Sequence, residues 1–155
     1  MTRGRQAAAV LGAFVIHGAA AGAAVGLAYS VVLIFVASFG ENDPAVRFMI
    51  DAFVFAVPFG MGMGLGIGLL SGLACGTVYA GLALTRGLPE RASPGAWLLP
   101  LLTALVTMAV ARSVLGLYFE PGDPLFVWVP AGLGAVAGAA AGHHMLPRGS
   151  GEASR

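Results

Sequence analysis

Residues Phe59–Ala80, FGMGMGLGIGLLSGLACGTVYA, contain the pattern that determines our interpretation of the whole chain. Glycine recurs there at every fourth position, at Gly60, Gly64, Gly68, Gly72 and Gly76. In a helix of 3.6 residues per turn, such a row forms a nearly continuous groove without side chains. In water each glycine would weaken a helix by about 1 kcal/mol relative to alanine, but in lipid the backbone must hydrogen-bond internally. The stretch therefore predicts a membrane-spanning helix whose groove lets another helix approach closely.

The composition of the chain agrees with membrane residence. Of its 155 residues, 58% are hydrophobic and 10% are charged, and the mean hydropathy is +0.88. A soluble domain carries about 25% charged residues, so this chain has too few charged residues to cover a water-facing surface. The net charge of +1, without a basic stripe, gives no reason to expect nucleic-acid binding. The single cysteine, Cys75, excludes an internal disulfide and a cysteine metal cage, and we predict no cofactor.

The apolar runs predict an all-α integral membrane protein with four transmembrane helices arranged as two hairpins. These helices cover about residues 8–38, 45–84, 97–118 and 125–145, within one transmembrane domain of residues 1–146. We expect residues 147–155 to form a short disordered cytoplasmic tail. A cleaved signal peptide is the alternative interpretation of the first apolar run, although that run continues well beyond its small residues.

The second apolar run, residues 45–84, is too long for a single straight crossing. At 1.5 Å per residue it would extend roughly 60 Å, about twice the thickness of the hydrocarbon core. Pro58 lacks a backbone N–H and is a common cause of helix kinks. We therefore predict a break near Pro58, with residues 45–57 at the outer interface and residues 58–84 crossing the membrane.

Basic and acidic residues alternate between successive loops. The basic set comprises Arg3, Arg5, Arg86, Arg91, Arg148 and Arg155, and the acidic set comprises Glu41, Asp43, Glu120 and Asp123. The positive-inside rule then places both termini in the cytoplasm after four crossings. All eight basic residues are arginine, which together with the richness in Ala, Gly and Val indicates a bacterial genome rich in GC. We expect a bacterial plasma membrane protein.

The acidic loops also supply helix starts. Asp43 precedes Pro44, and Asp123 precedes Pro124. Aspartate is a good N-cap, and proline suits the first helical turn because its missing N–H has no intrahelical partner there.

Two further helices carry rows of small residues. The first helix has Gly18, Gly22, Gly26 and Ser30, and the fourth has Gly134, Gly138 and Gly142. The first row is a natural partner for the groove of the second helix. The sequence leaves open whether that groove is filled internally, by a second copy or by another membrane subunit. The expected partners are thus the lipid bilayer and a possible homo-oligomer or other membrane subunits, with no nucleic acid.

The segment FGMGMGLGIGLLSGLACG, Phe59–Gly76, resembles the glycine-rich helix of rotary-ATPase c subunits. The following loop with Arg86 and Arg91, and the segment SVLGLY at Ser113–Tyr118, are similar to that family's polar loop and carboxylate helix. Ion transport in the family needs a carboxylate in the middle of the partner helix, whereas residues 97–118 contain no acidic residue. The resemblance therefore implies similar helix packing and does not extend to ion carriage.

Three ionisable residues within apolar runs are the candidate polar or ion-pair sites: His17, Asp51 and Arg112. Arg112 can pair with Asp51 or Glu120, or it can extend its charged end to the interface, and Arg47–Asp51 is the local alternative pair. His17 lies near the bilayer centre, where it can relay protons or donate an interhelical hydrogen bond.

Enzyme and metal chemistry find no support in the motifs. His143 and His144 are adjacent and lack a nearby acid or cysteine, so they make a poor metal site. The chain has no nucleophile, zinc or phosphate-binding motif, and we predict that it is not an enzyme. We expect a structural or accessory membrane subunit that acts through helix packing. The alternative is a small transporter or channel with a polar path near His17 and Arg112.

Overall fold

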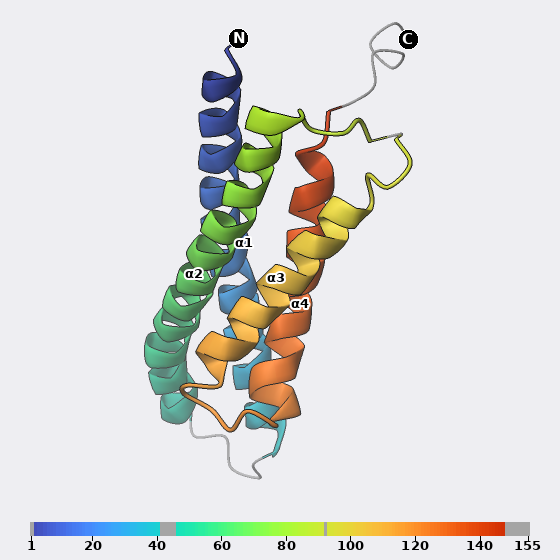
Figure 1. Ribbon diagram of the computed structural model, residues 1–155. Coiled ribbons are helices and arrows are strands. Elements are labelled where there is room, and N and C mark those ends of the chain that lie inside the picture. The colour runs from blue at the N-terminus through green and yellow to red at the C-terminus, as the bar shows by residue number, and fades with distance from the viewer. Residues whose placement is uncertain (1, 41–45, 92, 148–155) are drawn as a thin grey trace, which may run out of the picture.

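The computed structural model describes residues 2–40, 46–91 and 93–147, and the side chains of residues 2–35, 53–91 and 93–147. All regular structure in these ranges is helical, without a strand (Figure 1). The helices are α1 (Arg3–Gly40), α2 (Val46–Thr85), α3 (Leu98–Leu115) and α4 (Val129–His144), with a π-helical turn, η1 (Pro124–Trp128), before α4. Within the described residues, four helical segments are long and apolar enough to cross a membrane, which confirms the predicted all-α class with four candidate spans.

The predicted break near Pro58 is wrong. Helix α2 extends without interruption for 40 residues and contains Pro58 in its interior. Proline removes one backbone hydrogen bond and crowds the carbonyl four residues earlier. The helix nevertheless continues, because in lipid every further backbone group is best satisfied inside a helix. The predicted cap at Asp43 lies outside the described residues.

The other helix ends follow from local hydrogen bonds. Helix α3 ends three residues before the predicted Tyr118, because beyond Gly116 the bonds shift to the carbonyl three residues earlier: the Leu117 N–H donates to Val114 at 3.2 Å and the Tyr118 N–H to Leu115 at 3.0 Å. At the start of η1 the Asp123 carboxylate accepts from the N–H groups of Leu125 and Phe126, at 2.8 and 2.9 Å. This bond pair confirms the predicted aspartate cap before proline.

Helix α1 packs along α2, and α3 packs along α4 (Figure 1). Between α1 and α2 the backbones themselves meet. A Cβ atom built on Gly22 would overlap the carbonyl oxygen of Gly64, and one built on Gly64 would overlap the carbonyl oxygen of Gly22. The same reciprocal overlap joins Gly18 to Gly68. No side chain fits at these positions.

The other glycines of the predicted rows lie in the same two interhelical contacts. A Cβ on Gly26 would overlap Gly60, one on Gly72 would lie 2.5 Å from the Phe14 carbonyl oxygen, and one on Gly76 would lie 2.9 Å from Leu11. On α4, Gly138 and Gly142 face the hydroxyl groups of Thr107 and Thr103, at 2.6 and 2.8 Å from a built Cβ, whereas Gly134 is in ordinary contact with Thr107 at 3.5 Å.

A buried cluster joins the two helix pairs at the end where α1 begins and α4 ends. Its members are Phe14, Cys75, Tyr79, Ala96 and Leu146. The rings of Phe14 and Tyr79 lie 4.5 Å apart, and the Tyr79 hydroxyl shares a hydrogen bond with the Thr103 hydroxyl at 3.2 Å. This cluster fixes the relative position of the pairs at one end only.

Arg91, in the connection between α2 and α3, caps the last turn of α4. Its guanidinium donates from Nε to the Leu146 carbonyl at 3.1 Å and from Nη2 to the His144 carbonyl at 2.9 Å. The last carbonyls of a helix have no intrahelical partner, so a cation placed there stabilises the helix end. From the sequence, Arg91 was expected only to add to the positive charge that sets the orientation of the chain in the membrane.

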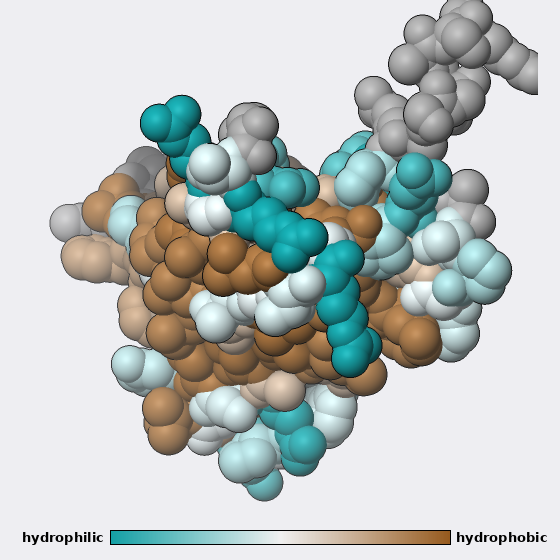
Figure 2. Space-filling view, turned by 45° about the horizontal axis from the view of Figure 1, so that its top comes forward, coloured by the Kyte–Doolittle hydropathy of each residue, from teal (hydrophilic) through white to brown (hydrophobic). Residues whose placement is uncertain are grey.

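The face of the molecule in Figure 2 is largely hydrophobic, with hydrophilic side chains gathered in clusters. Large apolar side chains are exposed on all four helices, among them Ile16 on α1, Phe55 on α2, Leu105 on α3 and Val136 on α4, which are 68%, 74%, 57% and 71% exposed. Many large apolar side chains exposed on every helix are typical of a surface that contacts lipid.

Candidate functional site: a cavity between the helix pairs

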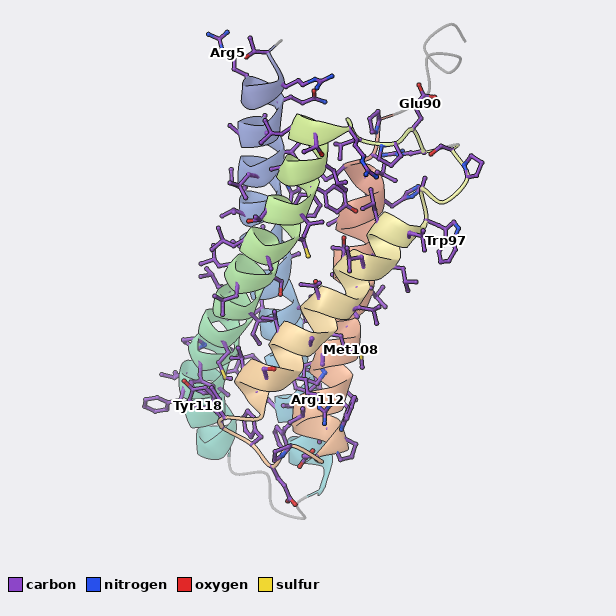
Figure 3. The ribbon with its side chains drawn as sticks, viewed as in Figure 1. Arg5, Glu90, Trp97, Met108, Arg112 and Tyr118 are labelled. Atoms are coloured by element: carbon purple, nitrogen blue, oxygen red, sulfur yellow. The ribbon has the colours of Figure 1, made fainter. Side chains whose placement is uncertain are left out.

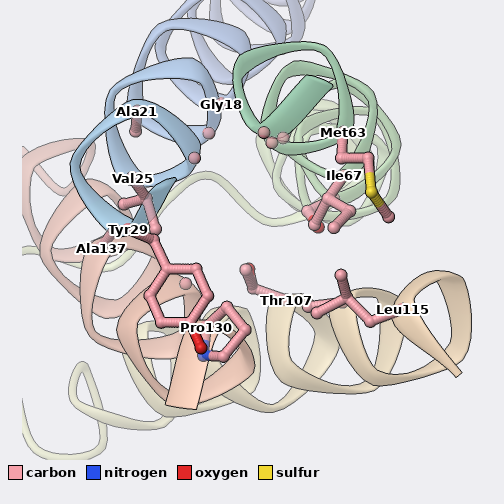
Figure 4. A pocket seen from close by; sticks show the side chains of 18 of the residues that line it. Gly18, Ala21, Val25, Tyr29, Met63, Ile67, Thr107, Leu115, Pro130 and Ala137 are labelled. Atoms are coloured by element: carbon pink, nitrogen blue, oxygen red, sulfur yellow. The ribbon is translucent and has the colours of Figure 1, made fainter. Parts of the chain in front are cut away.

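A cavity of about 650 Å³ lies between the two helix pairs. This volume lies within the range of roughly 300–1,000 Å³ that is typical of sites for small molecules. All four helices contribute to its wall. Figure 4 shows the side chains of Tyr29, Ile67, Thr107 and Pro130, one from each helix, pointing into the shared space.

The cavity is long. On α1 its lining extends from Phe14 to Ile34, a separation of twenty residue steps or roughly 30 Å along a helix axis. That length equals the usual thickness of the hydrocarbon core, about 30 Å. Phe14 and Cys75 belong to the buried cluster, so the cluster closes one end.

The opposite end of the cavity is bounded by contacts between α1, η1 and the loop before it. The Tyr29 hydroxyl donates to the Leu125 carbonyl. The rings of Phe119 and Phe126 stack with their centroids 5.1 Å apart and their planes 15° from parallel. The hydrogen bond from Tyr29 to Leu125 therefore joins α1 to η1, and so connects the α1–α2 pair to the α3–α4 pair at the end of the cavity opposite the buried cluster.

Glycines form much of the wall, which explains why no side chain fills the space. Gly22, Gly26, Gly60, Gly64 and Gly68 lie at the α1–α2 contact and also line the cavity. They bring backbone close to backbone but supply no side chain that could fill the space between the pairs.

The polar groups of the wall are mainly hydroxyls. The buried polar residues among the described side chains are Ser30, Ser71, Thr103 and Thr107, and all four line the cavity. Three of them donate to the carbonyl four residues earlier, Ser30 to Gly26 at 2.9 Å, Thr103 to Leu99 at 2.9 Å and Thr107 to Thr103 at 2.8 Å. Such bonds leave no free proton on those hydroxyls.

Ser71 differs from the other three. Its side chain is buried, with 5% of the residue exposed, and its hydroxyl has no hydrogen-bond partner in the structure. A buried hydroxyl without a partner costs about 1–3 kcal/mol, so native proteins retain few of them. Nothing in the sequence distinguished Ser71, because a serine within a glycine run is also a small packing residue.

His17 lies at the cavity wall but is exposed on α1. Its Nδ1 is 2.8 Å from the Ala13 carbonyl oxygen, so the tautomer protonated at Nδ1 donates to its own helix. The predicted interhelical partner is not found among the described residues.

Arg112 lies outside the cavity wall, at the end of the molecule opposite Arg5 and Glu90 (Figure 3). Its guanidinium carbon is 4.6 Å from the ring centroid of Trp128, which is a cation–π contact between α3 and η1. No ion pair joins Arg112 to Glu120 among the described side chains. The side chains of Arg47 and Asp51 lie outside the described residues, so their predicted pairs remain predictions.

In the part of the chain with described side chains, no three metal-ligating residues gather at one place. Comparison with known protein families, characterised proteins and solved structures finds no match to the chain.

Proposed function

We propose that the protein is a small multi-pass membrane protein that holds an apolar molecule in the cavity between two helical hairpins. The observation that carries this proposal is the cavity itself, because it is formed by all four helices and extends over about the thickness of the hydrocarbon core. Isolated hydroxyls on an apolar wall give water too few partners to fill such a space. A molecule dissolved in the bilayer is the natural occupant.

The proposal gives the glycine rows a structural role. We interpret the reciprocal contacts at Gly18–Gly68 and Gly22–Gly64 as a glycine zipper that makes α1 and α2 one rigid hairpin. The alternation of basic and acidic loops, together with the positive-inside rule, supports cytoplasmic termini in a bacterial plasma membrane, and Figure 3 places Arg5 and Glu90 at the same end of the molecule.

The geometry favours binding over conduction along a polar path. A path near His17 and Arg112 would need both residues along one cavity, but Arg112 is not in its wall. The wall is apolar apart from a few hydroxyls, and those of Ser30, Thr103 and Thr107 bond to carbonyls of their own helices.

An accessory role through helix packing is the second candidate, and it uses a different surface. Gly62 and Gly66 lie four residues apart on α2, outside the row that contacts α1. A Cβ built on either meets nothing within 4 Å, so this surface is open to another helix. If it holds a partner, Gly62→Leu will lower the mass of the particle measured by light scattering in mild detergent. An unchanged mass would exclude a stable contact there.

The cavity proposal is tested with a photoreactive hydrocarbon, an alkane with a diazirine in mid-chain, added to the protein in phosphatidylcholine nanodiscs. The labelled residues are located by mass spectrometry of peptides. We expect label on cavity residues such as Ile67 and Ala137 in addition to lipid-facing residues.

A matched pair of variants on α4 separates the two kinds of label. Ala137 lines the cavity, whereas Ala140 is exposed and does not. Ala137→Phe will reduce labelling of Ile67 while leaving the label at Leu105 unchanged, and Ala140→Phe will not reduce labelling of Ile67. Label confined to outward-facing residues in the unmodified protein would refute the proposal.

A further inference from the structure

We infer that Arg112 and Trp128 form a surface site for a zwitterionic phospholipid of the surrounding bilayer, with the lipid phosphate on the Arg112 guanidinium. The two side chains are exposed and come from different elements, α3 and η1, and the guanidinium carbon lies 4.6 Å from the centre of the Trp128 ring. Arg112 is absent from the cavity wall, so the inference is independent of the proposed function.

The contact with Trp128 leaves the hydrogen-bond donors of Arg112 unused. An aromatic ring attracts a cation, but a guanidinium also carries five N–H groups that bond to oxygen acceptors. Among the residues with described side chains, Arg112 has neither an ion pair nor a side-chain hydrogen bond. The nearby Asp123 carboxylate accepts from the backbone of η1 instead. Because Arg112 is exposed, a phosphate from outside the protein can reach its donors and accept two of them at once.

Arg112 lies at the level expected for lipid phosphates. Helix α3 has 18 residues, which is about 27 Å and close to the thickness of the hydrocarbon core. Arg112 is three residues before the end of α3, within reach of the head groups for a side chain of its length. Trp97, just before the start of α3, is 64% exposed at the opposite end (Figure 3). Tryptophan is enriched at both membrane interfaces, so Trp97 and Trp128 mark the two head-group levels.

The surface beside Arg112 favours a lipid over a free phosphate ion. Leu105 and Leu101 lie seven and eleven residues before Arg112, which places both within about 20° of it around the helix axis. Their side chains are 57% and 45% exposed. An exposed apolar stripe therefore extends from Arg112 toward the middle of the bilayer. A phospholipid uses both parts of this surface, with its phosphate on the cation and an acyl chain along the leucines.

The charges near Arg112 favour a head group that carries its own cation. The loop between α3 and η1 contributes the carboxylates of Glu120 and Asp123, so the described ionised groups at this end are two anions and one cation. A head group with a net negative charge is repelled by these carboxylates. An ethanolamine or choline head group places its positive charge where the exposed Glu120 attracts it.

The test uses Trp128 as a fluorescent probe. The chain has two tryptophans, so Trp97→Phe leaves Trp128 as the single one. This protein is placed in vesicles of digalactosyldiacylglycerol, which is uncharged and free of phosphate, with a small fraction of lipid brominated on its acyl chains. Bromine quenches tryptophan at contact and so reports which lipid adjoins Trp128. We expect phosphatidylethanolamine to be enriched there about fivefold over its mole fraction, the upper end for one exposed charge pair, and phosphatidylglycerol about half as much.

Two substitutions separate the parts of the site. In the same background Arg112→Gln will reduce the enrichment of phosphatidylethanolamine to its mole fraction, whereas Arg86→Gln, at an exposed arginine in the connection between α2 and α3, will preserve it. Glu120→Gln will raise the enrichment of phosphatidylglycerol to that of phosphatidylethanolamine, and this test remains if Arg112→Gln does not fold.

Three results would overturn the inference. The first is enrichment of phosphatidylethanolamine that is absent from the start or survives Arg112→Gln. The second is phosphatidylglycerol enriched as strongly as phosphatidylethanolamine beside unmodified Glu120. The third is loss of the enrichment on adding inorganic phosphate, which would show a site for a free anion. None of them bears on the labelling of the cavity.

Discussion

The contact between α1 and α2 makes a sharp prediction about two glycines that are two residues apart. A Cβ on Gly64 would overlap the Gly22 carbonyl oxygen and lie 2.9 Å from its carbon and 3.1 Å from the Gly26 Cα. A Cβ on Gly62 meets nothing within 4 Å. We predict that Gly64→Ala destabilises the protein and that Gly62→Ala does not.

The magnitude follows from the atoms involved. To restore ordinary contact, α1 and α2 must separate by roughly 1 Å at Gly64, because the opposing group is backbone and cannot rotate away. A gap of that size removes about a quarter to a half of the dispersion energy of each neighbouring contact. Overpacking of this kind costs about 1–3 kcal/mol, and we expect the upper half of that range. Gly62→Ala should stay within about 0.5 kcal/mol of the unmodified protein.

The assay is reversible unfolding by sodium dodecyl sulphate in mixed micelles, followed by circular dichroism. Gly64→Ala will unfold with a free energy about 2–3 kcal/mol below that of Gly62→Ala. The double variant Gly22→Ala/Gly64→Ala adds a second test. Once the first methyl group has separated the helices, the second costs less, so the two effects will be less than additive by about 1 kcal/mol.

Equal unfolding free energies for Gly64→Ala and Gly62→Ala would refute the reasoning. That result would mean that α1 and α2 do not meet along Gly22 and Gly64 in the folded protein. Full additivity of Gly22→Ala and Gly64→Ala would also contradict a shared contact.

Three further measurements test other parts of the structure. Arg91→Gln will lower the free energy of unfolding by about 1–3 kcal/mol, because it removes charged hydrogen bonds to the end of α4, and the exposed Arg86→Gln is the control that should change little. Asp123→Ala will cost about 1 kcal/mol through loss of the cap, whereas Glu120→Ala, at an exposed position without a cap bond, will not. In a Cys75→Ala background, an impermeant thiol reagent added to intact cells will label Glu120→Cys and spare Glu90→Cys, and the reverse pattern would exclude cytoplasmic termini.

The sequence predicted the helices well and their interruptions poorly. Charged clusters between long apolar runs were sufficient to predict four spans, and Asp123 before Pro124 marked the start of the last one. The break predicted at Pro58 does not occur, because in lipid the chain has no better conformation than a helix even where proline removes a hydrogen bond. A sequence pattern shows that proline removes a hydrogen bond from a helix. It does not show that a break in the helix would leave more backbone groups without partners in lipid.

The candidate site could not be predicted in the same way. Intramembrane charge directed attention to His17 and Arg112, yet His17 bonds to its own helix and Arg112 lies over Trp128, outside the cavity. The cavity depends on where four helices stand relative to one another, which periodicity does not specify. The Ser71 hydroxyl lacks the bond that Ser30 and the threonines make, and both kinds of serine look alike in sequence.

The cavity and the close helix contacts have one common cause. Glycine lets α1 and α2 approach until their backbones touch, and it contributes no side chain to the space that α3 and α4 leave beside them. Larger residues on the same faces would separate α1 from α2 and fill the space at once. A chain selected only for stability would have every reason to replace some of these wall glycines and alanines, such as Ala137, with larger apolar residues, since an unfilled apolar volume forfeits dispersion energy. The same glycines hold α1 against α2 and leave the space beside them open, as the proposed binding of an apolar molecule requires.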